Sequence, residues 1–537
     1  MPPHPSATHR PHLNAYAGYI GLACLIALCI VLRQPDQWRH PVVWIEDGTQ
    51  VLPDLLARGI ASLADPVNGY LVVCSKLISW IALQFGLPNY AIASTVLTLI
   101  ASTLCFTAIA FAPTRLRHAR WCALAAALAP VGPETFVSPI YLLWHTGILL
   151  LLVLVWDPSR HTVWRGAVLV FAGLSSPLVA FLLPLLALRW LILRHRSDLA
   201  CTAICLLVAA CQIYLAHRMG DTGGATPDNL EYLPVLLATV CGQFLSFALP
   251  PTWAAICGGM LLAWLALPLL DQRIPRDDRT NYLSLVGILV LSVAAMLLRV
   301  GHTEALQFHG PNRYYFFALI ALAWLVVQHA SLKSRWFVAI PLLLAVLANS
   351  LHQYRLHNPA QDILPLKWSA PAQIVKATGQ GSLPVFMLDR VVNLDVPLDV
   401  SLFKRGRSCA AHAAGARCVI HPWIIAHTDY PPAIPRRDGA IVSTSVQGQD
   451  LWARLDLGHN IGDRYREFHV VGKLAPLDME VLPFAGDGGP LFELHATFGS
   501  ADDAARFASS YCVAVVTDGK PALLASPNRE CDALLTH

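Results

Sequence analysis

Two adjacent carboxylates near the start of the chain are the first side chains whose types could do chemistry. Glu46 and Asp47 follow Trp44 and precede Gly48. A carboxylate can remove the proton from an attacking hydroxyl, and such a general base contributes roughly 10²–10⁴-fold to a rate. Because an apolar helical pattern follows, capping of that helix is the alternative role for Asp47. We interpret Asp47 as a candidate catalytic base, Glu46 as its alternate, and Trp44 as part of a substrate cavity.

A second group of reactive side chains lies later in the chain. His302, Glu304 and His309 precede Arg313, which is followed by Tyr314. A guanidinium can bind a phosphate through two parallel hydrogen bonds, so Arg313, with Tyr314 and His302, forms the candidate phosphate-binding group. An interfacial anchor within an aromatic belt is the alternative. The spacing of the two histidines and Glu304 is not diagnostic of a metal site. Whether the protein uses a divalent metal cofactor stays an open question.

Two further ionisable residues, Glu134 and His145, flank the outer end of the apolar segment 140–156. Ionisable groups at such places are functional candidates by default, although water at the membrane surface could solvate both. We assign Glu134, His145 and Glu304 to the substrate cavity, together with Trp44 and Tyr70. The chain has no P-loop, no dinucleotide-binding glycine motif, no C-x-x-C and no H-E-x-x-H. Their absence argues against an ATP-driven pump.

The elements that position these side chains follow from composition. The chain has 537 residues, 55% hydrophobic and 13% charged, with a mean hydropathy of +0.52. Soluble domains carry about 25% charged residues, so the composition excludes a disordered chain, a coiled coil and an ordinary cytosolic enzyme. The charge deficit is confined to residues 14–350. We predict a multi-pass α-helical membrane domain over 1–350 and a soluble domain over 351–537. The net charge of +4 indicates no nucleic-acid partner.

About eleven transmembrane helices are predicted, since a spanning helix needs about 20 mostly apolar residues. Two further apolar stretches, 70–87 and 233–249, are predicted to lie at the outer interface or to re-enter the membrane. Counting only the first of them as a span would invert the charge pattern of the loops. The predicted spans are 14–33, 90–112, 119–131, 140–156, 163–176, 177–193, 199–216, 253–270, 281–299, 314–329 and 336–350.

Arginine and lysine set the predicted orientation, because cytoplasmic loops carry an excess of them. With the N-terminus inside, the basic loops face the cytoplasm and the outer loops hold few basic residues. Asp47, Arg313 and the C-terminal domain then share the extracytoplasmic side. The basic loops are 114–120, 157–166, 189–198, 271–280 and 330–335, and the main outer loops are 34–89, 217–252 and 300–313.

The C-terminal region carries its own signals. Short apolar stretches between Pro and Gly turns predict a β-rich or α+β domain. An even number of cysteines in an extracytoplasmic domain suggests disulfides. Short loops favour the pairs Cys409–Cys418 and Cys512–Cys531, and four free thiols are the alternative. Trp423 and Trp452 could stack on sugar rings, although packing in the core is the interpretation favoured for both.

The layout resembles the GT-C superfamily of membrane glycosyltransferases, which take sugars from polyprenyl phosphates. The segment Trp44-Ile-Glu-Asp-Gly48, then Ser62-Leu63, Pro66 and Gly69-Tyr70-Leu71, looks like a bacterial multi-pass branch with a W-x-E-D-G first outer loop. Ser175-Ser176-Pro177 and Asn312-Arg313-Tyr314 look like further motifs of that branch. The resemblance covers about residues 14–350.

The resemblance implies an inverting glycosyltransferase of the bacterial inner membrane. Asp47, or Glu46, would be the base, and Arg313 would hold the lipid phosphate. The implied partners are membrane lipid, a polyprenyl-phosphate sugar donor, and an extracytoplasmic glycan or lipid acceptor. Many members hold a metal with a second acidic motif, which is not clear in this chain. Either Glu304 stands in for it or the enzyme needs no metal. A lipid-linked sugar flippase or transporter, and an enzyme like O-antigen ligases or polymerases, are the alternatives.

Overall fold

The chain is described by a computed structural model. The described residues are 11–39, 41–136, 138–218, 227–300, 313–333, 335–355, 368–378, 381–387, 390–396, 407–412, 415–420, 440–456, 467–472, 474, 476–484, 491–517 and 520–523.

Two compact units make up the structure. The first consists of residues 1–35, 58–80 and 96–356, and the second of 36–57, 81–95 and 357–537. The second unit therefore contains, besides the C-terminal residues, two segments that the sequence assigns to the membrane domain. Asp47 belongs to the second unit, whereas Arg313 belongs to the first.

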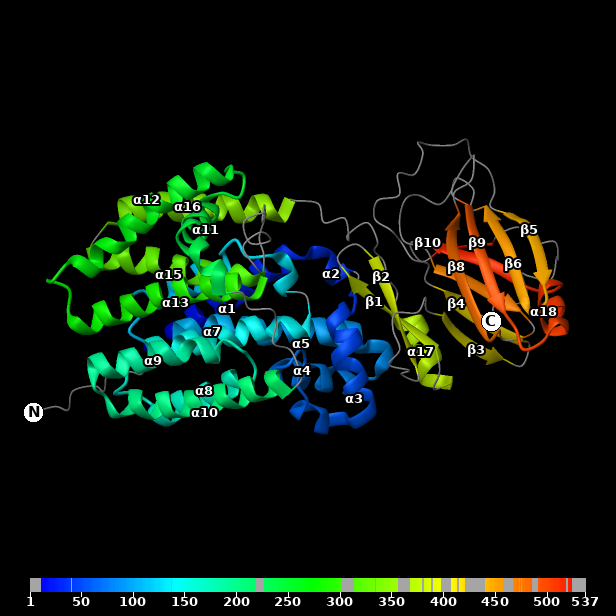
Figure 1. Ribbon diagram of the computed structural model, residues 1–537, viewed down its shortest axis with the longest axis horizontal. Helices are drawn as coiled ribbons and strands as arrows, with labels where there is room; N and C mark the ends of the chain where they lie inside the picture. Colours follow the sequence, from blue (N-terminus) through cyan, green and yellow to red (C-terminus); the bar gives the residue numbers. More distant parts are fainter. Residues whose placement is uncertain are drawn as a thin grey trace, which may run out of the picture. The chain divides into compact units, whose positions relative to one another are not determined.

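Helices build the first unit (Figure 1). Each of the eleven predicted spans overlaps one of them. The helices at these spans are α1 (Pro11–Arg33), α5 (Tyr90–Phe111), α6 (Ala119–Ala127), α7 (Leu142–Val155), α8 (Thr162–Gly173), α9 (Val179–Leu193), α10 (Arg196–Arg218), α12 (Pro251–Leu270), α13 (Arg276–Val300), α15 (Phe316–Lys333) and α16 (Trp336–Arg355).

Five helical segments are long and apolar enough to cross a membrane: Leu87–Phe111, Arg196–His217, Pro251–Leu270, Arg276–Leu298 and Arg313–Leu332. The other apolar helical segments, such as Ala17–Arg33 within α1 and Trp336–Leu351 within α16, have 10–17 residues. Among them, α4 (Val73–Gln84) and α11 (Leu233–Leu245) lie in the two stretches predicted at the interface. Both fall short of the roughly 20 residues that a span needs. The structure thus supports a multi-pass membrane protein, and the count of eleven spans stays a prediction.

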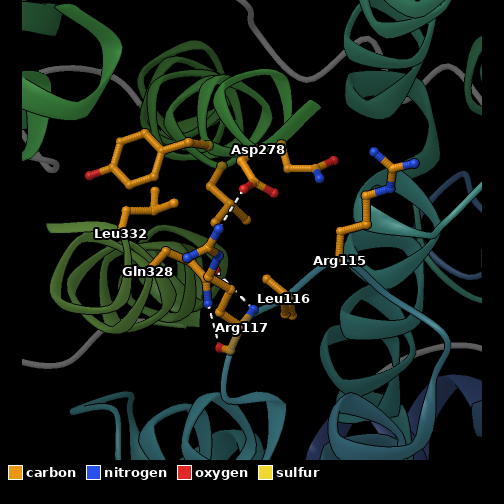
Figure 2. Close-up of a pocket in the computed structure, with 9 residues that line it drawn as sticks. Arg115, Leu116, Arg117, Asp278, Gln328 and Leu332 are labelled. Carbon is orange, nitrogen blue, oxygen red and sulfur yellow. Dashed lines mark hydrogen bonds and ion pairs between the residues drawn. The ribbon is translucent and has the colours of Figure 1, made fainter. Parts of the chain in front are cut away.

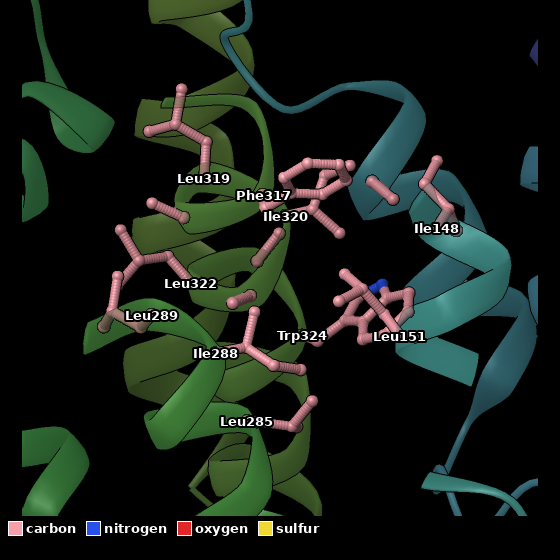
Figure 3. Close-up of a cluster of buried hydrophobic side chains, with 14 of the residues drawn as sticks. Ile148, Leu151, Leu285, Ile288, Leu289, Phe317, Leu319, Ile320, Leu322 and Trp324 are labelled. Carbon is pink, nitrogen blue, oxygen red and sulfur yellow. The ribbon is translucent and has the colours of Figure 1, made fainter. Parts of the chain in front are cut away.

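Helix α15 is the core of the first unit. Every residue from Tyr315 to Ala330 is buried, as expected for a helix that is apolar on all sides. Figure 3 shows its side chains, including Trp324, between those of α13 and α7. Arg313, which is predicted to bind phosphate, lies three residues before this helix. A buried core element therefore positions it.

Helices α11 and α12 approach each other through small residues. A Cβ atom at Gly242 would lie 1.9 Å from the Ala254 carbonyl oxygen, and one at Gly258 would lie 1.7 Å from the Ala238 carbonyl oxygen. Each helix therefore presents two small residues four positions apart. This pattern lets helix backbones pack closely in membranes.

Short elements occupy the predicted first outer loop and its flanks. They are α2 (Pro35–Arg39), a π-helix η1 (Asp47–Val51), α3 (Leu52–Arg58), and the 3₁₀ turns η2 (Gly59–Ala64) and η3 (Leu87–Asn89). The 3₁₀ turns η4 (Pro133–Phe136), η5 (Pro139–Tyr141), η6 (Pro227–Tyr232) and η7 (Arg313–Tyr315) precede helices of the first unit.

Strands dominate the C-terminal part of the second unit. The strands are β1 (Gly381–Met387), β2 (Arg390–Val396), β3 (Arg407–His412), β4 (Gly415–Ile420), β5 (Ala440–Gln447), β6 (Asp450–Asp456), β7 (Glu467–Gly472), β8 (Asp478–Phe484), β9 (Leu491–Thr497), β10 (Cys512–Thr517) and β11 (Lys520–Leu523), with helices α17 (Ser369–Thr378) and α18 (Ala501–Ala508).

These strands form antiparallel sheets in the orders β1-β2, β11-β10-β7-β4-β3 and β5-β6-β9-β8. Side chains of the two larger sheets share one core. Leu451 and Leu494 of the four-stranded sheet belong to the same buried cluster as Phe468 and Val513 of the five-stranded sheet, with Phe507 of α18. The alternation of inward and outward side chains that the sequence shows is therefore that of two packed sheets.

Candidate functional site

Asp47 is the first residue of the π-helix η1 and is only 1% exposed. Trp44 is buried and Glu46 is partly buried. The Gly48 amide donates to the Trp44 carbonyl at 2.8 Å. Glu46 precedes η1 in a helical conformation and makes no side-chain capping bond. Asp47 therefore lies inside the turn rather than before it, which does not fit the capping role.

A strand from the C-terminal region covers this turn. A Cβ atom at Gly48 would lie 2.0 Å from Cγ1 of Val385, which is itself fully buried in β1. Gly48 is required here by this close approach. Part of the cover over the Asp47 turn thus comes from a segment more than 300 residues later, which no local pattern could reveal.

Arg313 opens η7 in the first unit and is partly buried. Its Nη1 donates to the hydroxyl of Tyr141 at 2.7 Å. The guanidinium carbon lies 5.6 Å from the ring centre of Tyr141 and 5.5 Å from that of Tyr314, within the range of cation–π attraction. The sequence prediction included Tyr314 but missed Tyr141, because Tyr141 is distant along the chain.

The short turn η5, which holds Tyr141, also binds α4. Ser75 donates its hydroxyl to the carbonyl of Ile140 at 3.1 Å. The next residue, Lys76, is fully buried and donates from Nζ to the Ser62 carbonyl at 3.0 Å. Two cations on the predicted outer side, Arg313 and Lys76, are thus carried by elements that contact η5.

Tyr70 ends a tight turn in the first unit. Val67 and Tyr70 exchange backbone hydrogen bonds at 2.9 and 3.1 Å, and Asn68 and Gly69 between them both have positive φ. Asn-Gly is the preferred pair for such a type I′ turn. The Gln212 side chain accepts from the Leu71 amide at 2.8 Å. The motif that carries the family resemblance here is therefore a turn fixed to α10.

His145 lies fully buried in α7. Its Nδ1 is 2.8 Å from the Ser102 hydroxyl, and its ring contacts those of Phe106, Phe136 and Phe316. This geometry joins α5 to α7. Its assignment to the substrate cavity stays a prediction, as does that of Glu134, which belongs to η4.

Arg33 is a buried cation that sequence reasoning did not select. It donates to the carbonyls of Ala127, Ala129 and Val131 at 2.8, 2.6 and 3.1 Å, and its guanidinium lies 4.6 Å from the ring centre of Phe136. A cation at the last carbonyls of a helix is stabilised by the helix dipole. In the sequence, only its position as the last residue of an apolar span distinguishes Arg33 from other basic residues.

Several predicted residues lie outside the described part of the chain. They are His302, Glu304, His309, Trp423 and Cys531. Among the residues that the structure describes, no three His, Cys, Asp or Glu side chains are arranged to hold a metal ion.

Ion pairs surround a small cavity at one place on the predicted cytoplasmic end of the first unit. Figure 2 shows Arg117 directed toward Asp278, at 2.7 Å, and near Gln328. Arg115 pairs with Asp277 and lies 3.6 Å from Asp157. The cavity in that figure holds about 10 Å³, which is no more than one water molecule requires.

The pKa of two of these groups departs from its ordinary value. For Asp157 burial raises the pKa, but hydrogen bonds from Ser159 and the charges of Arg115 and Arg160 together outweigh it, so the net pKa is lowered. For Arg115 burial lowers the pKa, but the hydrogen bonds to Asp277 and Asp157 and their charges together outweigh it, so the net pKa is raised. Both shifts favour the charged forms and therefore the ion pair.

Cys512 forms a disulfide bond. The ten cysteines up to Cys257 are free thiols, so its partner is Cys409, Cys418 or Cys531. Cys409 and Cys418 face each other across β3 and β4, and β7 separates β4 from β10. Two strand spacings are about 10 Å, beyond the reach of a disulfide. The register therefore favours the predicted pairs, which stay predictions.

Trp452 lies on the polar face of the four-stranded sheet, not in the core. Its ring stacks on that of His495 with centres 3.9 Å apart, while its neighbours Leu451 and Ala453 point into the core. His495 Nε2 is 3.3 Å from Asp450, which accepts from Thr497 at 2.7 Å. The favoured core-packing interpretation of Trp452 is wrong, because side chains alternate between the faces of a strand.

No protein-family model, curated protein or solved structure matches the chain. The functional conclusions therefore depend on the geometry of the residues and on the sequence motifs.

Proposed function

We propose that this protein is an integral membrane glycosyltransferase of the GT-C type. It would transfer a sugar, with inversion, from a polyprenyl-phosphate donor to an extracytoplasmic glycan or lipid. The observation that carries the proposal is Asp47, a carboxylate that is 1% exposed at the start of a π-helix. Residues in π-helices are well under 1% of all residues, and such turns occur frequently at functional sites.

The proposed step needs one base and one phosphate-binding group. The acceptor oxygen attacks the anomeric carbon, the bond from that carbon to the phosphate oxygen breaks, and the acceptor proton passes to Asp47. A polyprenyl phosphate leaves readily, so little acid catalysis is required. Arg313 would stabilise the charge on the departing phosphate, and Tyr141 would hold the guanidinium through the 2.7 Å bond.

Lys76 adds a second cation for the donor phosphate. Lys76 is fully buried and donates to the Ser62 carbonyl. An anionic donor near η5 would gain from both Lys76 and Arg313. This charge arrangement serves a transporter of lipid-linked sugars equally well, so only the requirement for Asp47 separates the two functions.

The test compares Asp47→Asn with Asp54→Asn, a change of another acidic residue in the same predicted loop. Cells lacking the protein would receive each variant at matched membrane abundance, and mass spectrometry would quantify sugars on surface glycans and lipids. We expect Asp47→Asn to lower transfer by roughly 10²–10⁴-fold and Asp54→Asn to retain it. Arg313→Gln should also lower transfer.

Normal transfer by Asp47→Asn would refute the proposed base. If Arg313→Gln were inactive while Asp47→Asn stayed active, the transporter would be the better description. An Asp54→Asn variant as inactive as Asp47→Asn would show that the loop is needed only for folding.

A further inference from the structure

A cavity lies between the beginnings of α8 and α10, on the predicted cytoplasmic side of the first unit. Its volume is about 490 Å³, within the range of small-ligand pockets. Thr162, His195, Arg196 and Ser197 supply its polar lining. No acidic side chain lines it among the described residues. Figure 1 shows these two helices side by side.

The lining changes from polar to apolar along the helices. Arg196 begins α10, and Ile204 lies about 12 Å further along at 1.5 Å per residue. Val163, Gly166 and Ile204 form the apolar part. A Cβ atom at Gly166 would lie 3.5 Å from Ile204 Cδ1, so the absence of a side chain at Gly166 keeps this part open. A molecule with a polar head and an apolar chain fits such a lining.

Behind the polar end lies a buried group with excess positive charge. Asp198 is 2.7 Å from Arg165 and 3.1 Å from Arg189, and all three side chains are fully buried. Two guanidinium groups thus share one carboxylate. Arg165 also donates to the hydroxyl of Ser197, which lines the cavity, at 3.4 Å. An uncompensated buried charge is costly, and an anion beside Ser197 would offset it.

The buried ion-pair group behind the cavity is not fully hydrogen-bonded. Arg165 Nη2 and Asp198 Oδ2 are both buried and have no hydrogen-bond partner among the described residues. Buried polar atoms in native structures nearly always have a partner. The first amides of α8 and α10 add partial positive charge at the same end.

The exposed protein surface beside the cavity is apolar. Val163 is 83% exposed and Trp164 is 68% exposed at the start of α8. Exposed tryptophans are typical of the level at which lipid headgroups meet the apolar membrane. Basic pockets between membrane helices on the cytoplasmic side bind anionic lipid headgroups.

We propose that this cavity binds one anionic phospholipid, with the headgroup phosphate at Arg196, His195 and Ser197 and an acyl chain along Val163, Gly166 and Ile204. The site lies on the membrane side opposite to the predicted location of Asp47. The lipid is therefore a bound membrane component and not the sugar donor, and the proposal does not depend on the proposed function.

Native mass spectrometry of the full-length protein in detergent tests this site. Phosphatidylglycerol and phosphatidylcholine with identical acyl chains would be titrated separately. We expect the wild type to bind one phosphatidylglycerol at least fivefold more tightly than phosphatidylcholine. Arg196→Gln should weaken phosphatidylglycerol about fivefold and leave phosphatidylcholine unchanged. Gly166→Leu should weaken both lipids, because it fills the apolar part.

Arg194→Gln is the matched control, because Arg194 is exposed, lies two residues away and does not line the cavity. Equal binding of the two lipids by the wild type would overturn the proposal, and so would equal losses in Arg194→Gln and Arg196→Gln. Millimolar inorganic phosphate should not displace the lipid. Displacement by phosphate would identify a site for free anions instead.

Discussion

Asp47 and Gly48 are neighbours whose roles in the structure differ. The carboxylate of Asp47 is buried within a π-helix, and Gly48 allows β1 to approach through Val385. Sequence reasoning selected the carboxylate from its chemical type. The close approach of Val385 is a tertiary contact, and it explains why no larger residue fits there.

Replacing Gly48 by Ala tests this contact. The new methyl group would overlap the Val385 side chain, and such overpacking costs about 1–3 kcal/mol. We expect a lower melting temperature for the full-length protein in detergent. Val385→Ala combined with Gly48→Ala should recover part of the loss. A melting temperature equal to that of the wild type would contradict the close approach.

Among the helices, packing depends on which face carries the small residues. Gly258 and Gly259 are adjacent in α12, yet only Gly258 lies against α11, while a Cβ at Gly259 would meet nothing within 4 Å. In the strands, side-chain hydrogen bonds join neighbours: Asp450 of β6 is bonded to His495 and Thr497 of β9. In both cases the register between two elements decides what a residue does.

Gly258→Ala and Gly259→Ala form a matched pair. We expect Gly258→Ala to destabilise the protein by about 1–3 kcal/mol, because the helices must move apart. Gly259→Ala should be neutral or slightly stabilising. Thermal unfolding of both full-length variants would measure the difference, and equal melting temperatures would exclude close packing at Gly258.

The pH dependence of the β6–β9 pair follows from Asp450. A hydrogen bond from Thr497, and then contact with His495, lowers the pKa of this carboxyl below its ordinary value of 3.8, although burial opposes this. A lowered folded-state pKa means that the stabilisation is present above about pH 4 and is lost as pH falls through the folded pKa.

Hydrogen exchange of β6 and β9 amides in the full-length protein would measure this effect. After correction for intrinsic exchange, protection should fall when the pH is lowered from 5 to below 4. Asp450→Asn should reduce that dependence. An unchanged pH dependence in Asp450→Asn would assign the effect to other groups.

For the whole molecule, the distribution of charge predicts the orientation. The loops predicted as cytoplasmic contain many arginines, but the structure pairs several of them with Asp157, Asp198, Asp277 and Asp278. The rule for orientation counts basic residues and is little affected by acidic ones. These pairs therefore do not alter the predicted topology, although they reduce the net charge at that end.

A reporter fused after residue 355 tests the orientation. We expect alkaline phosphatase to be active there, because the predicted topology places the following domain outside, where the Cys512 disulfide can persist. A green fluorescent protein fusion at the same residue should be dark. The opposite result would invert the topology and place Asp47 and the C-terminal domain in the cytoplasm.

The sequence by itself determined that the chain has an apolar helical region followed by a strand-rich one. Helix and strand periodicity and the scarcity of charge are local properties, so they can be recognised without a structure. For the same reason Asp47, Arg313 and Tyr70 could be selected as polar residues in unusual surroundings. Their roles in catalysis and binding remain proposals.

The tertiary structure decided which distant residues meet. It placed Val385 over the Asp47 turn, Tyr141 on Arg313, and Asp198 between Arg165 and Arg189. It also moved Trp452 from the expected core to a polar sheet face. These contacts join residues of separate elements, and their energies depend on packing and desolvation that exist only once the chain has folded.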